Sequence, residues 1–108
     1  MNDISFVGVE PSEALRAYAD RKLVALADVA SPTSSRLVIT ASRHSHSGDR
    51  FRAKIELVVR GATVIAGARQ ELADPYAAVD AAYDEAKRAL QERSDRRGRH
   101  DRGATRRT

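Results

Sequence analysis

The chain has 108 residues, of which 42% are hydrophobic, and this is enough for one globular domain with a modest core. It contains no cysteine, which excludes disulfides, thiolate metal sites and a thiol nucleophile, and no apolar run approaches the roughly 20 residues that cross a bilayer. The net charge of +4 is uneven, because residues 93–108 hold seven arginines and two aspartates (+5), whereas residues 1–92 hold 12 bases and 13 acids (−1).

The first elements in chain order are a strand predicted over residues 4–9 and a helix predicted over residues 13–27. Ile4 and Phe6 face inward from the strand. Ser12 is a suitable N-cap, since its hydroxyl can accept from a free backbone N–H of the first turn. The inner stripe of the helix has helical spacing and consists of Leu15, Ala19, Leu23 and Leu26.

Lys22 falls within the same arc of this helix. Its ammonium must therefore either reach water at the rim of the core or meet the negative charge of a ligand. The sequence leaves both readings open.

Three further strands are predicted over residues 36–42, 51–59 and 63–70, with residues 43–49 as a connector. The middle strand alternates most clearly. Its inward positions are Phe51, Ala53, Ile55, Leu57 and Val59, and its outward positions are Arg52, Lys54, Glu56 and Val58. Residues 60–62 are short enough for a hairpin turn.

The last predicted helix covers residues 74–93. Asp74 can cap it, and Pro75 suits its first position because a missing N–H costs nothing there. Its apolar stripe consists of Tyr76, Val79, Tyr83, Ala86 and Leu90, and its polar side carries Asp80, Asp84, Lys87 and Arg88. Residues 94–108 are Gly/Arg-rich and lack apolar side chains to pack, so we expect a disordered basic tail.

This order predicts an α+β domain over residues 1–93 with the succession βαβββα. The three consecutive strands favour antiparallel neighbours in a four-stranded sheet. Two amphipathic helices can cover one face only, which leaves the other face open. That open face would show Val38, Val58 and Ile65 among Thr40, Arg52 and Lys54. Such a surface fits either an ordinary exposed sheet or a partner, including a weak homodimer.

Catalysis finds little support in the sequence, which has no Gly-x-Ser-x-Gly motif and no phosphate-cradling glycine loop, and whose carboxylates are scattered on helix faces rather than paired on strand ends. We therefore predict neither an enzyme nor a cofactor. His44 and His46 project to one side of an extended loop and so form a candidate metal pair. No third ligand is identifiable from the sequence, although Asp49 or a partner chain could supply one. Solvated loop histidines are the commoner alternative.

Nucleic acid is the better-supported ligand, because an arginine-rich tail attracts phosphate. Bases on the two helices add a strip that Asp20, Asp80, Asp84 and Glu85 interrupt. The alternatives are solvated helix faces and a tail that serves solubility or binds an acidic protein. The candidate RNA-binding residues are Arg16, Arg21, Lys22, Lys87, Arg88, Arg93, Arg96, Arg97 and Arg99.

Several local patterns resemble the ribosome hibernation-promoting factors, the family that includes ribosome-associated inhibitor A. They are the helix start Pro-Ser-x-Ala-Leu-Arg over residues 11–16, the alternating residues 51–57, the loop His-Ser-His-Ser-Gly over residues 44–48 and the block Asp-Pro-Tyr-Ala-Ala-Val-Asp over residues 74–80. The loop over residues 44–48 is similar to that of a branch of the family with a histidine-containing connector. The chain resembles a short form of the family, because it shows no separate C-terminal dimerisation domain.

The resemblance implies a domain shaped like double-stranded RNA-binding domains that sits in the mRNA/tRNA channel of the small ribosomal subunit. It implies translational inhibition of idle ribosomes under stress or in stationary phase, in the bacterial cytoplasm. Contacts to 16S rRNA phosphates would come from the positions of Lys22, Lys87 and Arg88. The chain departs from the family pattern at Glu85 and Glu92, where relatives are often basic. A general RNA-binding stress module and a metal-binding protein are the remaining hypotheses.

Overall fold

Four strands form one sheet in the order β1-β2-β3-β4 and two helices accompany it. The computed structural model describes the backbone of residues 2–44, 48–67 and 71–107, and the side chains of residues 2–43, 48–67 and 71–93. The elements are β1 (Asn2–Val7), α1 (Glu13–Ala30), β2 (Ser34–His44), β3 (Gly48–Val59), β4 (Ala62–Gly67) and α2 (Pro75–Arg107). The predicted α+β fold and its βαβββα order are confirmed.

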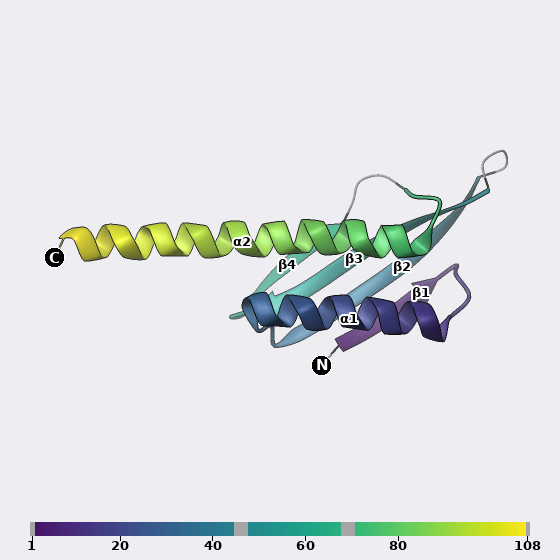
Figure 1. The fold of residues 1–108 in the computed structure, drawn as a ribbon, viewed down its shortest axis with the longest axis horizontal. Helices are drawn as coiled ribbons and strands as arrows, with labels where there is room; N and C mark the ends of the chain where they lie inside the picture. Colours follow the sequence, from purple (N-terminus) through teal and green to yellow (C-terminus); the bar gives the residue numbers. More distant parts are fainter. Residues whose placement is uncertain (1, 45–47, 68–70, 108) are drawn as a thin grey trace.

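The strand directions follow from the connections between them. β1 and β2 are parallel, with Ile4 opposite Leu37, because α1 carries the chain back between them. The short links of β2 to β3 and of β3 to β4 give antiparallel pairs. Both helices lie on the same face of the sheet, side by side and running in the same direction (Figure 1). The other face stays open, as predicted.

β2 and β3 are longer than predicted, because the expected connector over residues 43–49 largely belongs to them. Their ladder continues to the pair His44 and Gly48. Phe51 of β3 also exchanges two backbone hydrogen bonds with Leu72, with N···O distances of 2.7 and 2.8 Å. Polar composition suggested a loop here, but the continuing ladder satisfies the backbone and overrides that preference. The predicted end of the fourth strand, residues 68–70, lies outside the described residues.

A two-residue turn joins β3 to β4, since Val59 pairs with Ala62. Both turn residues have positive φ, 51° at Arg60 and 80° at Gly61. This combination is what a type I′ hairpin requires, because its twist matches that of the strands. Glycine adopts such a φ without cost, whereas arginine does so rarely.

The core lies between the two helices and the covered face of the sheet. The predicted stripe of α1 and the five inward positions of β3 are buried, apart from Phe51, which is half-buried. Ser12 caps α1 by accepting from the backbone N–H of Leu15 at 3.3 Å. The stripe of α2 is turned relative to the prediction: Tyr76 and Tyr83 are half-buried, and Ala78 and Ala82 are buried against the sheet instead. Small alanines let the helix approach the strands closely, so the tyrosines turn toward α1.

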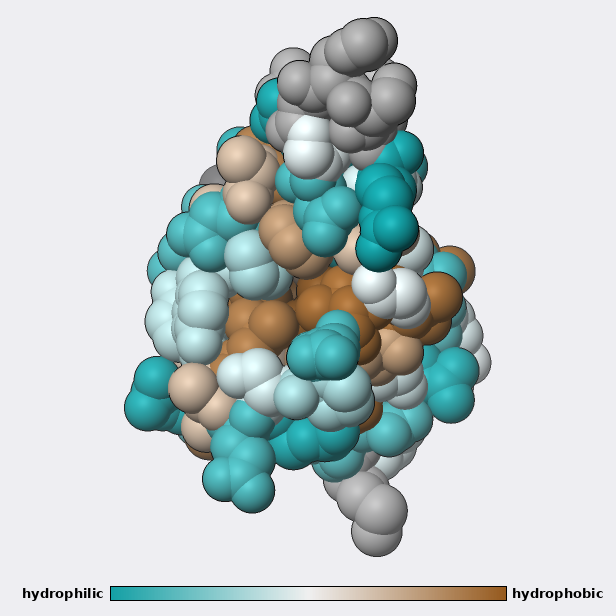
Figure 2. All heavy atoms as spheres, turned by 90° about the vertical axis from the view of Figure 1, so that its right-hand side faces the viewer, coloured by the Kyte–Doolittle hydropathy of each residue, from teal (hydrophilic) through white to brown (hydrophobic). Residues whose placement is uncertain are grey.

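At the end of the molecule where both helices begin, apolar side chains reach the surface. Figure 2 views this end and shows an apolar area framed by polar residues. Partly buried residues that pack against the core here are Phe6, Val9, Phe51 and Leu72. None of the described helices is long and apolar enough to cross a membrane.

α2 continues past Arg93, where the sequence predicts its end, and remains helical to Arg107. Figure 1 shows this last part projecting beyond the sheet. Leu90 is the last described residue of α2 in the core. The extension contains Gly98 and Gly103, and glycine is a poor helix former. The predicted basic tail, residues 94–108, therefore overlaps the helical part of α2 that projects beyond the sheet, and its separation from the domain stays a prediction.

Candidate nucleic-acid interface

The two helices meet along a line of half-buried polar and aromatic side chains, which we call the helix seam. α1 contributes Tyr18 and Lys22, four residues apart, and α2 contributes Tyr76, Asp80 and Tyr83, spaced by four and three. Such spacing places each set on one row of its helix. The parallel helices bring the two rows together.

Asp80 is the centre of the seam. Its Oδ1 accepts a hydrogen bond from the Tyr18 hydroxyl and lies 3.4 Å from Nζ of Lys22. The Lys22 ammonium lies 4.8 Å from the ring centre of Tyr83 and 5.3 Å from that of Tyr18. Tyr18 also packs edge-on against Tyr76, with ring centres 5.1 Å apart. The aromatic faces and the carboxylate together stabilise the ammonium.

The placement of Asp80 corrects the sequence-based assignment to the solvent side of α2. Its carboxylate also answers the open question about Lys22, because the negative charge near this ammonium comes from the chain itself. The Lys22 side chain is 29% exposed, so its ammonium keeps partial access to solvent beside Asp80. The sequence analysis predicted neither this network nor the role of Asp80. Two features of the sequence pointed to it: the spacing of Tyr76, Asp80 and Tyr83, which places them on one row of α2, and the position of Lys22 within the apolar arc of α1.

The hydrogen bond to Asp80 is the main cause that raises the pKa of Tyr18 above its usual value, and burial and the charge of Asp80 act in the same direction. The neutral hydroxyl is therefore favoured in the folded protein. Its contribution to stability is fully present below the unfolded-state pKa and is lost as pH rises through the higher folded-state pKa. At neutral pH the contact is intact.

The other two predicted RNA-binding bases of α1, Arg16 and Arg21, lie in different places. Arg21 is exposed and its guanidinium lies 5.7 Å from the ring centre of Tyr18, so it borders the helix seam. Arg16 does not join it. Its Nη1 donates to the carbonyl of Ile4 at 3.2 Å, and the guanidinium stacks over Phe6 at 5.1 Å. These contacts tie Arg16 to β1.

The predicted bases of α2 also differ from one another. Lys87 is exposed, follows Tyr83 by four residues, and forms no ion pair within the part of the chain whose side chains are described. Arg88 pairs with Glu85 at 3.3 Å, one turn before it on α2. The Arg88 side chain is 67% exposed, so solvent screens this pair. Lys87 is therefore the more available cation.

Arg93 leaves the predicted surface altogether. It comes three residues after buried Leu90, on the sheet-facing side of α2, and lies near the turn between β3 and β4. Arg96, Arg97 and Arg99 lie on the helical extension of α2, and their side chains are outside the described set.

The open sheet face carries charge pairs of its own. Lys54 lies 3.2 Å from Glu56, and Arg36 lies 3.2 Å from Asp3. Ile65 is 62% exposed there. The weak homodimer through this face stays a prediction. Among the described side chains no group of three or more acids or histidines could hold a metal, and His46 and the side chain of His44 lie outside them.

Replacing Tyr76 by alanine tests whether the aromatic part of the seam is structural. Tyr76 is half-buried against Tyr18 and the core, so Tyr76→Ala should lower the free energy of unfolding by about 1–3 kcal/mol. Urea denaturation measures this loss, and Tyr76→Phe is the matched control that keeps the ring. An alanine variant of unchanged stability with impaired RNA binding would identify Tyr76 as a base-stacking platform instead.

Comparison with known proteins adds a family to this geometry. Residues 3–98 match the family described as Sigma 54 modulation protein / S30EA ribosomal protein. A crystal structure of the Thermus thermophilus Protein Y N-terminal domain is similar to the chain, with 25% identity and a TM-score of 0.67, and the match covers 85% of this chain and 98% of that one. No curated protein matches.

Proposed function

Because the chain belongs to the Sigma 54 modulation protein / S30EA ribosomal protein family, we propose that it occupies the mRNA/tRNA channel of the small ribosomal subunit and so inhibits translation by idle ribosomes under stress or in stationary phase. The family consists of ribosome-associated hibernation factors, which are not enzymes. Ribosome association implies a cytoplasmic location.

The observation that supports this proposal most is the grouping of cations along the helix seam. Parallel packing brings Arg21 and Lys22 of α1 to the same surface as Lys87 of α2, and Lys87 has no ion-pair partner among the described side chains. α2 then continues from this surface into the arginine-rich extension. A surface of this kind suits the phosphates of folded RNA, here 16S rRNA, with little dependence on base sequence.

The seam also predicts how such contacts form. An approaching phosphate replaces the Asp80 carboxylate beside Lys22, while the faces of Tyr18 and Tyr83 keep the ammonium in position. Arg88 makes the corresponding exchange with Glu85 at greater exposure. Each new contact pairs a side-chain cation with an RNA phosphate, so binding should weaken strongly as the salt concentration rises.

Occupancy of the channel is tested by competition on purified 30S subunits. The protein should co-sediment with 30S and 70S ribosomes in sucrose gradients, and saturating mRNA with initiator tRNA should displace it. A protein that co-sediments equally well in the presence of both ligands binds elsewhere on the ribosome.

Deleting residues 94–108 should weaken ribosome association without unfolding the domain. The deleted segment carries six arginines and two aspartates, and the described core ends before it, so the melting temperature should stay nearly unchanged. The slope of log K against log salt should become shallower by several units, at roughly 0.7–0.9 per lost phosphate contact. Pelleting with 30S subunits over a salt series measures the affinity and its salt dependence. If the truncated protein binds as tightly as the full chain at every salt concentration, residues 94–108 do not anchor the protein to RNA.

The extension also favours a second candidate, a general RNA-binding module, because arginine-rich segments bind many RNAs. Comparing the affinity of the protein for 30S subunits with its affinity for a free 16S rRNA fragment distinguishes a ribosome factor from a general RNA-binding module. A ribosome factor prefers the assembled subunit by at least tenfold, whereas a general module shows no preference.

A further inference from the structure

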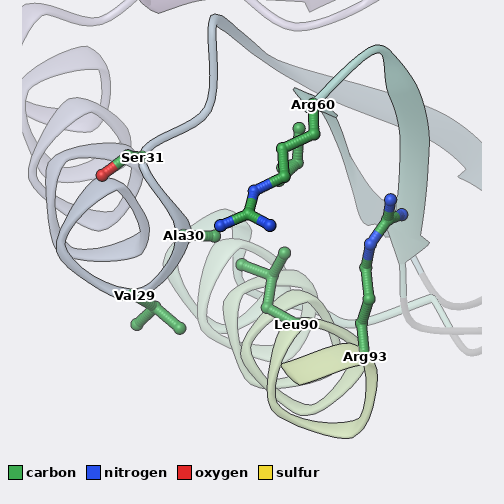
Figure 3. A pocket seen from close by; sticks show the side chains of 7 residues that line it. Val29, Ala30, Ser31, Arg60, Leu90 and Arg93 are labelled. Carbon is green, nitrogen blue, oxygen red and sulfur yellow. The ribbon is translucent and has the colours of Figure 1, made fainter. Parts of the chain in front are cut away.

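A cavity of about 310 Å³ lies at the end of the molecule opposite the apolar area of Figure 2. Here α1 ends, α2 passes the end of the sheet, and β3 turns into β4. Its lining consists of Val29, Ala30 and Ser31 of the α1 end, Val59 and Arg60 at the turn, and Leu90 and Arg93 of α2. Figure 3 shows the Arg60 guanidinium reaching between Ala30 and Leu90, and the Arg93 side chain extending alongside the neighbouring strand at the other edge of the cavity.

The sequence positions of the two arginines explain why they line a cavity. Arg93 takes the next inward place on α2 after buried Leu90, where the sheet no longer supplies a packing partner. Arg60 occupies a left-handed turn position with φ of 51°, which asparagine or glycine would adopt more easily. A residue held in such a conformation points to a role for its side chain.

The charge of the cavity is unbalanced. Of the described residues that line it, none is acidic, and neither Arg60 nor Arg93 forms an ion pair within the described side chains. Two guanidinium groups that line one cavity give it a positive charge, which a bound anion balances. Leu90, Val59 and Val29 form an apolar wall beside them.

We propose that this cavity binds the phosphate group of a nucleotide, with Arg60 and Arg93 on the phosphate oxygens and the sugar or base against the apolar wall. Guanidinium groups match phosphate geometry, and two of them suit its charge better than that of a carboxylate. The volume is at the small end for ligand sites, which suits one nucleotide unit. The nucleotide comes either from an RNA chain or from the free pool. This site is separate from the helix seam, so it stands or falls independently of the ribosome proposal.

Arg60 has an alternative role that is purely structural, and the variants must distinguish it from phosphate binding. The C-terminal turn of α1 carries no basic residue, so Arg60 beside Ala30 could serve only to balance the partial negative charge of that helix end. Arg60→Asn separates the two roles, because asparagine suits the left-handed turn and removes the guanidinium. Arg93→Gln removes the second charge. Arg43→Gln is the matched control, since the Arg43 side chain is 90% exposed on β2.

The experiment follows the methyl signals of Leu90 and Val59 and the arginine Nε signals of the full chain by NMR. The probes are inorganic phosphate, uridine 5′-monophosphate, uridine, and a short RNA without terminal phosphates. Phosphate and the monophosphate should shift these signals saturably, the monophosphate at least threefold more tightly, and uridine should not. Arg60→Asn and Arg93→Gln should each weaken binding at least tenfold, with Arg43→Gln unchanged and Arg60→Asn no less thermally stable.

Tighter binding of the RNA assigns the site to an RNA chain, and tighter binding of the monophosphate assigns it to a free nucleotide. The proposal is overturned if no probe shifts the signals saturably, if uridine binds as well as its monophosphate, or if either pocket variant binds like the wild type. A less stable Arg60→Asn protein with unchanged binding would leave Arg60 as the partner of the α1 end.

Discussion

Replacing Lys22, Lys87 and Arg88 together by glutamine should weaken binding to isolated 30S subunits on the order of a hundredfold at moderate salt, with the slope of log K against log salt reduced by about 3. The reason is that each side chain offers one phosphate contact from the helix surface. Glutamine keeps the stem of Lys22 on Tyr83, so the seam remains packed. The measurement is pelleting over a salt series, with circular dichroism to confirm the fold.

The matched control changes the same net charge elsewhere. Arg36, Arg43 and Lys54 lie on strands and are exposed, so their replacement by glutamine should alter 30S binding less than threefold if the helices face the ribosome. Glu85→Lys should tighten binding, because it removes the partner of Arg88 and adds a cation one turn from it. Normal binding by the helix triple variant together with a loss in the strand variant would move the ribosome-facing surface to the open sheet.

The largest effect on stability is expected from Leu23→Ala, with a loss of about 2–5 kcal/mol in the free energy of unfolding. Leu23 is fully buried in the α1 stripe, and its removal leaves a cavity that helices packed on a sheet cannot close easily. A domain of this size has roughly 5–15 kcal/mol of stability, so the variant should be close to its folding limit at 37 °C.

Val24 provides the control, because it neighbours Leu23 on α1 and is 50% exposed. Val24→Ala should change stability by less than about 0.5 kcal/mol. Urea titrations of both variants should give midpoints that differ while the m-value stays constant. Equal midpoints would show that α1 is not packed as described.

The sequence by itself determined the elements whose periodicity is strong. The spacing of Leu15, Ala19, Leu23 and Leu26 fixed the buried side of α1, and strict alternation fixed both faces of β3. Each pattern can be read within one short segment, because the regular geometry of a helix or strand places the residues of one face at fixed intervals along the sequence. The inward place of Arg93 was also available, since it continues the row that ends with Leu90.

The tertiary structure decided which neighbours these faces meet. The length of β2 and β3 depended on their pairing to His44 and Gly48, which outweighs the polar composition of the connector. The ion pair of Lys22 with Asp80 required α1 and α2 to run side by side in the same direction, a relation that neither helix encodes alone. Arg16 donates to the carbonyl of Ile4, and Arg93 lines the cavity. The charge of a side chain does not specify its partner, because the elements packed around the side chain decide which groups it can reach.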